Sequence, residues 1–307
     1  MSATLSTIAE FVVRVAFWMA LAPLGPGIIN KVKAWVAGRK GPPVLQLYYD
    51  LARLWRKGVV ISTAASPGHI IGPAIAWIAI SCAAALLPIG PFGSTVSFRG
   101  DAFLFIYLLA VARFAIACAS LETGSAFEGM GTAREVSYAV LAEAALITAL
   151  ITLSVRTGSL SLSGMLTPFA GSGVMLIGAG LFIVLLAENC RVPFDDPNTH
   201  LELTMVHEAM VLDHSGPPFA AILHGSAIKL LLFAVLLADA VLPGLHLGGL
   251  GGMAVTVLAL GIIMVGVGAV ESLLARFAFR RVPLLLITAF LLCLFGLLAA
   301  WKGSSLQ

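Results

Sequence analysis

Carboxylates, histidines and one arginine are concentrated between residues 188 and 216, in a chain that is 60% hydrophobic and only 11% charged. Glu188, Asp195 and Glu202 can take up and release protons, and His207, with Glu208 beside it, carries an imidazole, a group that often serves as a proton shuttle. Ionisable side chains in or beside lipid are costly and are therefore rarely without a role. The segment predicts proton handling in a hydrated cavity, with structural hydrogen bonding as the alternative.

The spacing in the same segment predicts how it folds. Glu188 and Arg191 are three positions apart, which is typical of an ion pair at a helix end. Asp196 followed by Pro197 predicts the start of a new helix, because aspartate caps the free N–H groups and proline fits the first helical position. We therefore expect a helix, a short break after Arg191, and a second helix that carries the remaining ionisable residues.

A metal site is the other chemistry to weigh. His200 and His207 would lie two turns apart on one face of the second helix, with Glu208 close by. However, the sequence after His207 lacks the second histidine of a zinc-protease helix. The cysteines occur singly, without a Cys-x-x-Cys pair, which argues against an iron–sulfur cluster, a c-type haem or a structural zinc. We expect no metal and no cofactor on this chain.

Three ionisable residues stand alone inside long apolar segments: Glu143, Lys229 and Asp239. A single charge at such depth is costly unless it is paired or neutralised, so each predicts a partner on another helix or a place beside a hydrated path. For Glu143 we weigh a protonation site, with Arg134 or Lys229 as the nearby cation, against a structural hydrogen-bonding role. Lys229 and Asp239 are too far apart along one helix to pair with each other.

Long apolar blocks form the expected framework for these residues. The mean hydropathy is +1.02, and a helix needs roughly 20 apolar residues to cross a bilayer. The chain is therefore predicted to be an all-α integral membrane protein with a single polytopic domain, residues 1–307. We expect about eight spans, the fifth of them short: residues 7–29, 69–88, 102–121, 136–155, 174–187, 219–242, 253–274 and 283–301.

Positive charge is distributed unevenly between the two sides of this framework. Twelve lysines and arginines lie in connections after odd-numbered spans, and only Arg99, Arg156 and Lys302 lie in the others. Because positive charge is enriched on the cytoplasmic side, we expect both termini outside and the motif-bearing loops in the cytoplasm. The net charge of +3 gives no reason to expect a nucleic-acid partner.

Two further cytoplasmic features are expected. Leu47, Leu51 and Leu54 recur at helical spacing with charged residues on the other sides, which predicts an amphipathic helix along the membrane surface after the first span. This helix either only anchors the chain in lipid or also roofs the entrance to a cavity. Gly129 and Gly131 lie in a glycine-containing stretch before the fourth span, which argues against a regular helix there and predicts a turn packed against protein.

The residues of the central segment resemble a known family. The pattern Ala-Glu-x-x-Arg-x-Pro-Phe-Asp-x-Pro, followed by Glu-Leu, is present from Ala187 to Leu203. This pattern is similar to that of complex I subunit 1, the membrane subunit of NADH-quinone oxidoreductase that joins the two arms of the respiratory complex. Arg134 with Glu143, and Gln46 with Asp50, match two further family patterns.

Departures from that pattern favour one branch of the family. Asn198 and His200 stand where quinone-reducing enzymes usually carry additional glutamates, and His214-Ser215-Gly216 stands where they have Tyr-Ser-Gly. The segment looks like that of the membrane-bound group 4 [NiFe] hydrogenases of the formate hydrogenlyase and energy-converting type. We therefore assign no quinone pocket from the sequence.

The resemblance implies a membrane-anchoring and coupling subunit of a hydrogenase-type oxidoreductase complex in the cell (inner) membrane, with no active site on this chain alone. The implied partners are the hydrogenase large and small subunits, a ferredoxin-like subunit and antiporter-like membrane subunits, and these would carry the [NiFe] and 4Fe-4S centres. The alternative is the corresponding subunit of a quinone-reducing, complex I-like enzyme.

The resemblance also carries over the roles of individual residues. It implies Glu143, Glu188, Asp195 and Glu202 as candidates for coupling or a proton path, and Asp50 through the pattern that it matches. Their positions as ionisable residues in or beside apolar segments add His207, Glu208, Lys229 and Asp239 as further candidates. The implied structural or docking residues are Gly129, Gly131, Arg134, Arg191, Pro193, Asp196 and Pro197.

Overall fold

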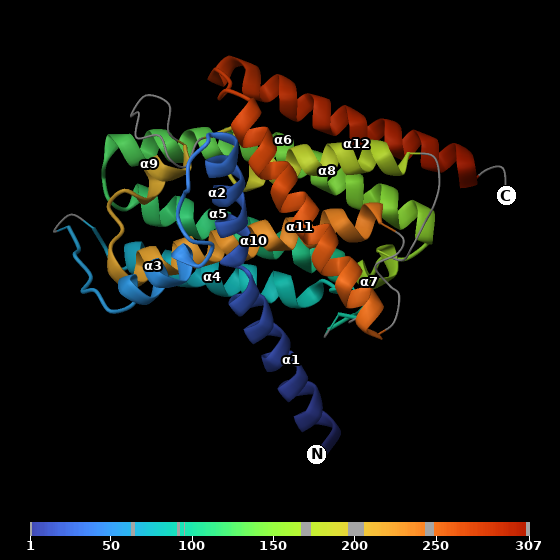
Figure 1. Cartoon of the computed structure of the whole chain (residues 1–307), viewed down its shortest axis with the longest axis horizontal. Helices are drawn as coiled ribbons and strands as arrows, with labels where there is room; N and C mark the ends of the chain where they lie inside the picture. The colour runs from blue at the N-terminus through green and yellow to red at the C-terminus, as the bar shows by residue number, and fades with distance from the viewer. Residues whose placement is uncertain are drawn as a thin grey trace.

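The computed structural model describes residues 2–62, 65–90, 93–94, 96–166, 173–195, 206–242 and 249–304. Within these residues the chain forms helices joined by short connections, with no strand (Figure 1). The helices are α1 (Ser2–Leu21), α2 (Leu24–Val36), α3 (Gln46–Leu54), α4 (Gly68–Leu86), α5 (Asp101–Leu121), α6 (Ala126–Thr157), α7 (Leu162–Met165), α8 (Val174–Glu188), α9 (His207–Val211), α10 (Gly216–Val241), α11 (Gly249–Leu273), the 3-10 turn η2 (Phe279–Arg281) and α12 (Val282–Ser304).

The prediction of an all-α multi-pass membrane protein is confirmed. Seven segments of the described chain are long and apolar enough to cross a membrane, the first formed by α1 and α2 together over Phe11–Val36. The expected fifth span is α8, which is apolar but has only 15 residues. At 1.5 Å per residue it is about 22 Å long, less than the roughly 30 Å of a bilayer core.

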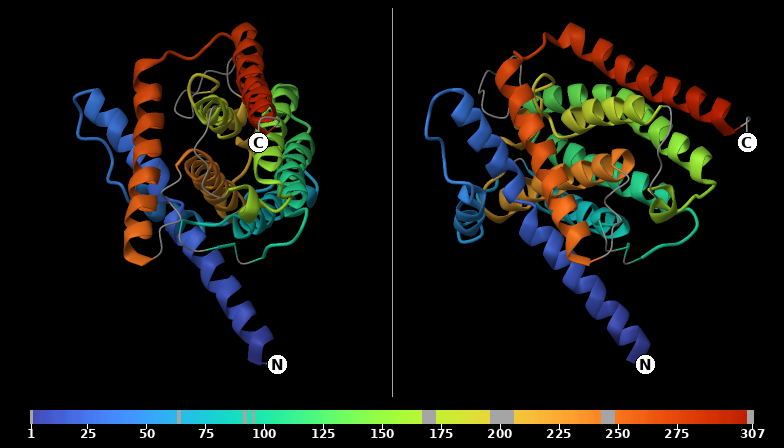
Figure 2. Two further views of the ribbon diagram at one scale, coloured as in Figure 1. Left: turned by 90° about the vertical axis from the view of Figure 1, so that its right-hand side faces the viewer. Right: turned by 45° about the vertical axis from the view of Figure 1, so that its right-hand side comes forward.

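Helix α10 lies at the centre of the bundle. It contacts α4, α8 and α11, and the end-on view in Figure 2 shows it enclosed by the other helices. On another side, α12 lies along α6 and α8. Small residues allow the close packing: a Cβ atom added at Gly72 of α4 would lie 2.6 Å from the carbonyl oxygen of Ala115 in α5.

The central part of α10 is entirely apolar. Between Lys229 and Asp239, every residue from Leu230 to Ala238 is buried and hydrophobic. The ten-residue separation corresponds to about 15 Å along the helix axis, or roughly half of the bilayer core. Lys229 and Asp239 therefore belong to separate regions of the molecule.

The expected irregular turn around Gly129 and Gly131 is wrong, because α6 already begins at Ala126. Gly131 is inside the helix, and a Cβ atom there would lie 2.9 Å from both the Cβ of Ala209 and the carbonyl oxygen of Val206. Gly131 therefore allows α6 to pack closely against α9 and does not interrupt the helix. Gly129 has no such close neighbour, since an added Cβ would lie 3.8 Å from Leu121.

A helix is present where the amphipathic pattern predicts one. Helix α3 buries Leu51 and contacts α10 and α2, while Tyr49 and Trp55 stay exposed. The rings of Trp55 and Trp77 of α4 are 6.1 Å apart. Helix α3 therefore covers one end of the bundle, and its position relative to a membrane surface stays a prediction.

Candidate functional site

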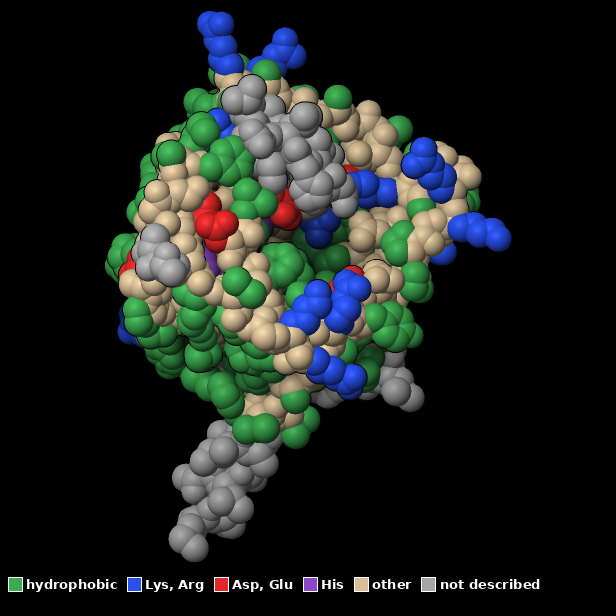
Figure 3. Space-filling view, turned by 90° about the vertical axis from the view of Figure 1, so that its left-hand side faces the viewer, with side chains coloured by type: hydrophobic (Ala, Val, Ile, Leu, Met, Phe, Trp, Pro, Cys, Tyr) green, Lys and Arg blue, Asp and Glu red, His purple; other side chains and the backbone are tan. Residues whose placement is uncertain are grey.

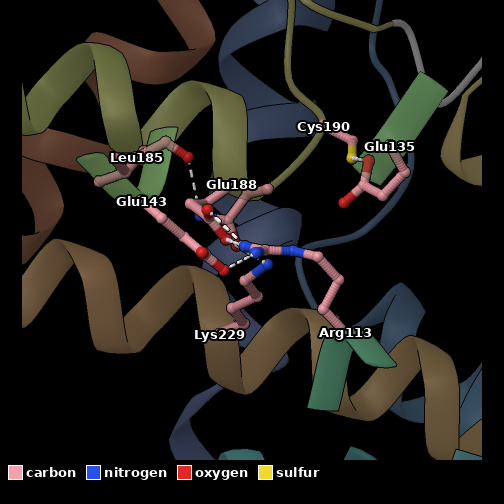
Figure 4. Close-up of polar contacts among 8 residues, drawn as sticks. Arg113, Glu135, Glu143, Leu185, Glu188, Cys190 and Lys229 are labelled. Atoms are coloured by element: carbon pink, nitrogen blue, oxygen red, sulfur yellow. Dashed lines mark hydrogen bonds and ion pairs between the residues drawn. The ribbon is translucent and has the colours of Figure 1, made fainter. Parts of the chain in front are cut away.

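Four charged side chains from four different helices meet inside the bundle (Figure 4). Arg113 of α5 lies between two carboxylates: it forms an ion pair with Glu143 of α6, and its Nη2 lies 2.6 Å and 2.8 Å from the two carboxylate oxygens of Glu188 in α8. Lys229 of α10 completes the group at 2.7 Å from Glu188. We call these four residues the ion cluster; it holds two positive and two negative charges.

Burial makes the ion cluster energetically important. Only 3% of the Glu188 side chain and 12% of the Arg113 side chain are exposed, whereas 35% of the Glu143 side chain is exposed. Buried charges are tolerated where each has a partner and hydrogen bonds, and losing one partner leaves the other uncompensated. Because its two acids are balanced by two bases, the cluster can exist in the charged form.

A cavity of about 80 Å³ adjoins the ion cluster. Its polar wall includes Arg113, Glu188, Lys229 and His207, and its apolar wall includes Trp77. A cavity needs only about 10–15 Å³ for each water it holds, so there is room for several waters in contact with titratable groups. The expected hydrated cavity is thus supported by geometry for Glu188, His207 and Lys229.

A second cavity of about 20 Å³ is also lined by Arg113 and Glu188 and reaches Asp195. Asp195 forms an ion pair of 3.1 Å with Arg276 and accepts hydrogen bonds from the backbone N–H groups of Val206 and His207. The Asp195 carboxylate therefore caps the start of α9, where anions are favoured. It links the cavity wall to the connection between α11 and α12.

The predicted ion pair between Glu188 and Arg191 is wrong. Arg191 Nη1 lies 3.3 Å from Glu271 of α11, and Glu271 is also 2.8 Å from Lys33 of α2. The reason is the end of α8, where Cys190 has a positive φ of 49° and the Arg191 N–H bonds to the Leu186 carbonyl. This Schellman-type ending turns the chain sharply, so Arg191 leaves the side of the helix on which Glu188 lies.

Cys190 is unusual because glycine normally occupies this left-handed position, which costs other residues about 1–2 kcal/mol. Its thiol donates to Glu135 of α6 over 3.7 Å. Burial raises the pKa of the Cys190 thiol well above its usual range, and the Glu135 carboxylate adds to this effect. The thiol is therefore neutral at physiological pH and acts as a hydrogen-bond donor in the cavity wall.

The predicted structural residues lie at helix junctions near the ion cluster. The Arg134 guanidinium lies 4.5 Å from the centre of the Phe279 ring, a cation–π contact that ties the start of α6 to η2. Pro193 accepts a hydrogen bond of 3.0 Å from the Phe277 N–H. Both residues therefore fasten the segments that carry Asp195 and Arg276.

His214 lies apart from the ion cluster, in the connection between α9 and α10. Its ring lies against that of His69, with 3.9 Å between the ring centres and 30° between the ring planes. Burial lowers the pKa of His214 to about 4, and the neighbouring His69 contributes to this shift. At neutral pH the His214 ring is therefore uncharged.

Two of the predicted site residues, Asp50 and Asp239, also lie apart from the ion cluster. Asp50 pairs with Arg53 at 2.9 Å and accepts hydrogen bonds from Gln46 in α3. Asp239 is buried, and neither carboxylate oxygen has a hydrogen-bond partner in the described part of the chain. Glu208 is in the first turn of α9. Glu202, Asp196, Pro197 and His200 lie outside the described residues, and the predictions for them stay untested.

Arg113 is the functional residue that sequence reasoning missed. It is a single arginine in the middle of an apolar span, and that alone is a signal of an intramembrane partner. Glu143 pairs with Arg113, whereas the sequence suggested Arg134 or Lys229. Among the residues that the structure describes, no group of three metal-ligating side chains is arranged to hold a metal ion.

The fold and the site together define a multi-pass helical membrane protein with a buried, balanced ion cluster in the wall of a cavity. A family model described as NADH dehydrogenase matches residues 8–301, so the chain belongs to that family. The fold is also that of a chain in the membrane-bound sulfane sulfur reductase, an archaeal respiratory membrane complex. That likeness has a TM-score of 0.84 at 20% identity and covers 96% of this chain and 99% of the other.

Relatives in two branches of the family are similar in sequence. Hydrogenase-4 component C of Escherichia coli K12 is 30% identical over 233 residues, which is 73% of this chain and 72% of the relative. Formate hydrogenlyase subunit 4 of the same organism is 29% identical over 231 residues, 73% of this chain and 74% of the relative. A subunit of the NADH-quinone oxidoreductase of Ralstonia pickettii is 25% identical over 246 residues, 70% and 66% of the two chains.

Proposed function

We propose that this chain is the membrane-anchoring and coupling subunit of a hydrogenase-type oxidoreductase complex. It docks a soluble arm that carries the [NiFe] and 4Fe-4S centres and links the redox chemistry of that arm to proton or cation movement. The observation that carries the proposal is the ion cluster of Arg113, Glu143, Glu188 and Lys229 beside a cavity. The greater similarity to the two hydrogenase-system subunits than to the NADH-quinone oxidoreductase subunits favours the hydrogenase branch.

The coupling step follows from electrostatics. Glu188 lies within 3 Å of two cations, and each of them favours its charged form. A charge that arrives in the docked arm changes the potential at the ion cluster and shifts the proton affinity of its acids. The cluster can then take up a proton at Glu143 or Glu188 when negative charge arrives and release it when that charge leaves.

Neighbouring membrane subunits are expected along the outward face of α6. Val136, Val140, Ile147 and Ile151 are exposed on this face, and Glu143 lies in the same stripe. A partly exposed carboxylate in an apolar stripe at membrane depth is costly against lipid. A polar helix from an antiporter-like subunit would remove that cost, in agreement with the proposed partners.

The proposed orientation has both termini outside and α3, α9 and the connection from α11 to α12 in the cytoplasm. Lys and Arg side chains stand around much of this end of the molecule (Figure 3). In a chain with its own four cysteines replaced, we expect Lys40→Cys to react with a membrane-impermeant maleimide only in permeabilised cells. Arg99→Cys is the matched control and should react in intact cells, because it lies in a connection on the other side. The reverse labelling pattern would reject this orientation.

The second test concerns Glu143. Glu143→Gln keeps the size of the side chain and its capacity to accept a hydrogen bond from Arg113, but it does not titrate. We expect the complex to assemble and its hydrogenase to work with an artificial dye, while turnover with the physiological donor, or its dependence on the ion gradient, falls severalfold.

Glu143→Asp is the matched control, because it restores a titratable group at the same position and should recover part of the physiological turnover. Wild-type turnover and a normal gradient response in Glu143→Gln would return this residue to a structural role.

A quinone-reducing complex is the second candidate, because subunits named for NADH-quinone oxidoreductase match the chain at 25–26% identity. The two candidates differ in what is isolated with the chain. If the complex is of the hydrogenase type, the natively purified complex should contain nickel and iron. If it reduces quinone, a stoichiometric amount of quinone should be extracted from it and nickel should be absent. Isolation of the chain alone, without any redox subunit, would contradict both.

A further inference from the structure

The connection from α3 to α4 contains a short segment, Gly58 to Ser62, that forms neither helix nor turn. It loops outward at the end of the molecule that carries α3 and α9 (Figure 1). The Val60 N–H donates to the Ser215 hydroxyl oxygen over 2.9 Å, and this hydroxyl donates back to the Val60 carbonyl over 3.2 Å. A residue whose N–H and C=O both reach one side has the geometry of a β-strand residue.

The start of α10 fixes this segment in place. Gly216 has a φ of +57°, and a Cβ atom there would lie 2.7 Å from the Gly58 carbonyl oxygen. The glycine is therefore required both for its left-handed conformation and for the close approach of the two backbones. One edge of the segment is thus held against Ser215 and Gly216.

Among the residues that the structure describes, none pairs with the other edge of the segment. In a strand, the residues on either side of Val60 direct their N–H and C=O groups to the opposite edge. Val59 and Ile61 make no hydrogen bond within the described part of the chain, and the exposed fractions of residues 59, 60 and 61 are 41%, 74% and 46%. Three exposed β-branched residues with an unpaired backbone edge form a template for pairing with another strand.

We propose that Val59–Ile61 binds an extended segment of the soluble arm by β-strand addition. The inference rests on the proposed function, because it names how the docked arm is held. Arg56 and Lys57 are exposed immediately before the segment, so an incoming strand flanked by acidic residues would be complementary to it in charge. Lipid is a poor occupant, because hydrocarbon offers no hydrogen-bond partner to the backbone groups.

The test removes one backbone donor. Ile61→Pro eliminates the N–H on the free edge, and the preceding residue lies outside any helix, as a residue before proline should. Ile61→Thr keeps the N–H and the β-branched shape and is the matched control. We expect Ile61→Pro to weaken retention of the soluble arm by about fivefold to tenfold, as for the loss of one backbone hydrogen bond. Ile61→Thr should retain the arm nearly as well as the wild type does. The comparison is made at equal amounts of the wild-type chain and of both variants in the membrane.

Amide hydrogen exchange provides the second measurement. The Ile61 amide should exchange slowly in the whole complex and rapidly in vesicles that contain the membrane subunits without the arm. Rapid exchange in the complex, protection by vesicles alone, or full retention of the arm by Ile61→Pro would each overturn strand addition. If the wild-type chain itself retains no soluble redox subunit, the proposed function fails first, and that outcome is distinct from the other three.

Discussion

Arg113→Ala is expected to prevent accumulation of the folded chain in the membrane. The substitution leaves Glu143 without its cation and Glu188 with Lys229 alone, in a site where Glu188 is nearly inaccessible to water. Breaking a buried ion pair by removing one partner costs about 3–5 kcal/mol, a large part of the stability of most domains. The measurement is the amount of chain in membranes, together with its midpoint of thermal unfolding in detergent.

Two further variants separate charge from shape at this site. Arg113→Lys keeps the charge but loses the planar fork that reaches two carboxylates at once, so its stability should be intermediate. Arg113→Leu combined with Glu143→Leu leaves the pair of Glu188 and Lys229 and should recover much of the lost protein, because no charge is then unpaired. Normal accumulation and melting of Arg113→Ala would mean that the cluster contributes nothing to folding.

Glu271→Ala should have an effect of similar size. Glu271 is buried and pairs with both Lys33 of α2 and Arg191 after α8. Its loss would leave two cations close together, again at a cost of about 3–5 kcal/mol. We expect reduced assembly and a lower unfolding midpoint, measured as for Arg113.

Asp50→Ala is the matched control for Glu271→Ala. The side chains of Asp50 and Arg53 are 29% and 67% exposed, and surface ion pairs contribute only about 0–1 kcal/mol. Asp50→Ala should therefore leave the unfolding midpoint almost unchanged. Equal effects of the two substitutions would contradict the assignment of Glu271 to a buried three-residue ion group.

The helical framework could be predicted because its signal is local. A run of apolar residues predicts a helix of matching length, so each expected block overlaps a described helix, and the shortness of α8 is visible in the sequence. The ends were less accurate: α2 continues to Val36, and α6 begins ten residues before the expected fourth block. The glycines before the fourth span were misleading for the opposite reason. Gly131 is explained by the backbone of α9, which is distant in sequence and invisible to a local argument.

The site could be predicted in part. Glu188, Lys229 and Glu143 are conspicuous as charges among apolar residues, and the expectation that Lys229 pairs with another helix is confirmed by its contact with Glu188. The actual partners depend on how four helices rotate against each other, which spacing along one helix does not encode. For Arg191, the left-handed turn at Cys190 decided the outcome, and a cysteine gives no sequence signal for such a turn.

The apolar stretch of α10 from Leu230 to Ala238 has a consequence for the membrane as an electrical insulator. No charged or polar side chain of α10 lies between Lys229 and Asp239. Over about 15 Å, this helix therefore has no side chain that could bind an ion. Much of a membrane voltage can drop across such a dry layer, each elementary charge that crosses it gaining or losing about 2.3 kcal/mol per 100 mV. In the proposed function, a proton exchanged at Glu188 would therefore find no polar side chain of α10 to carry it across this stretch.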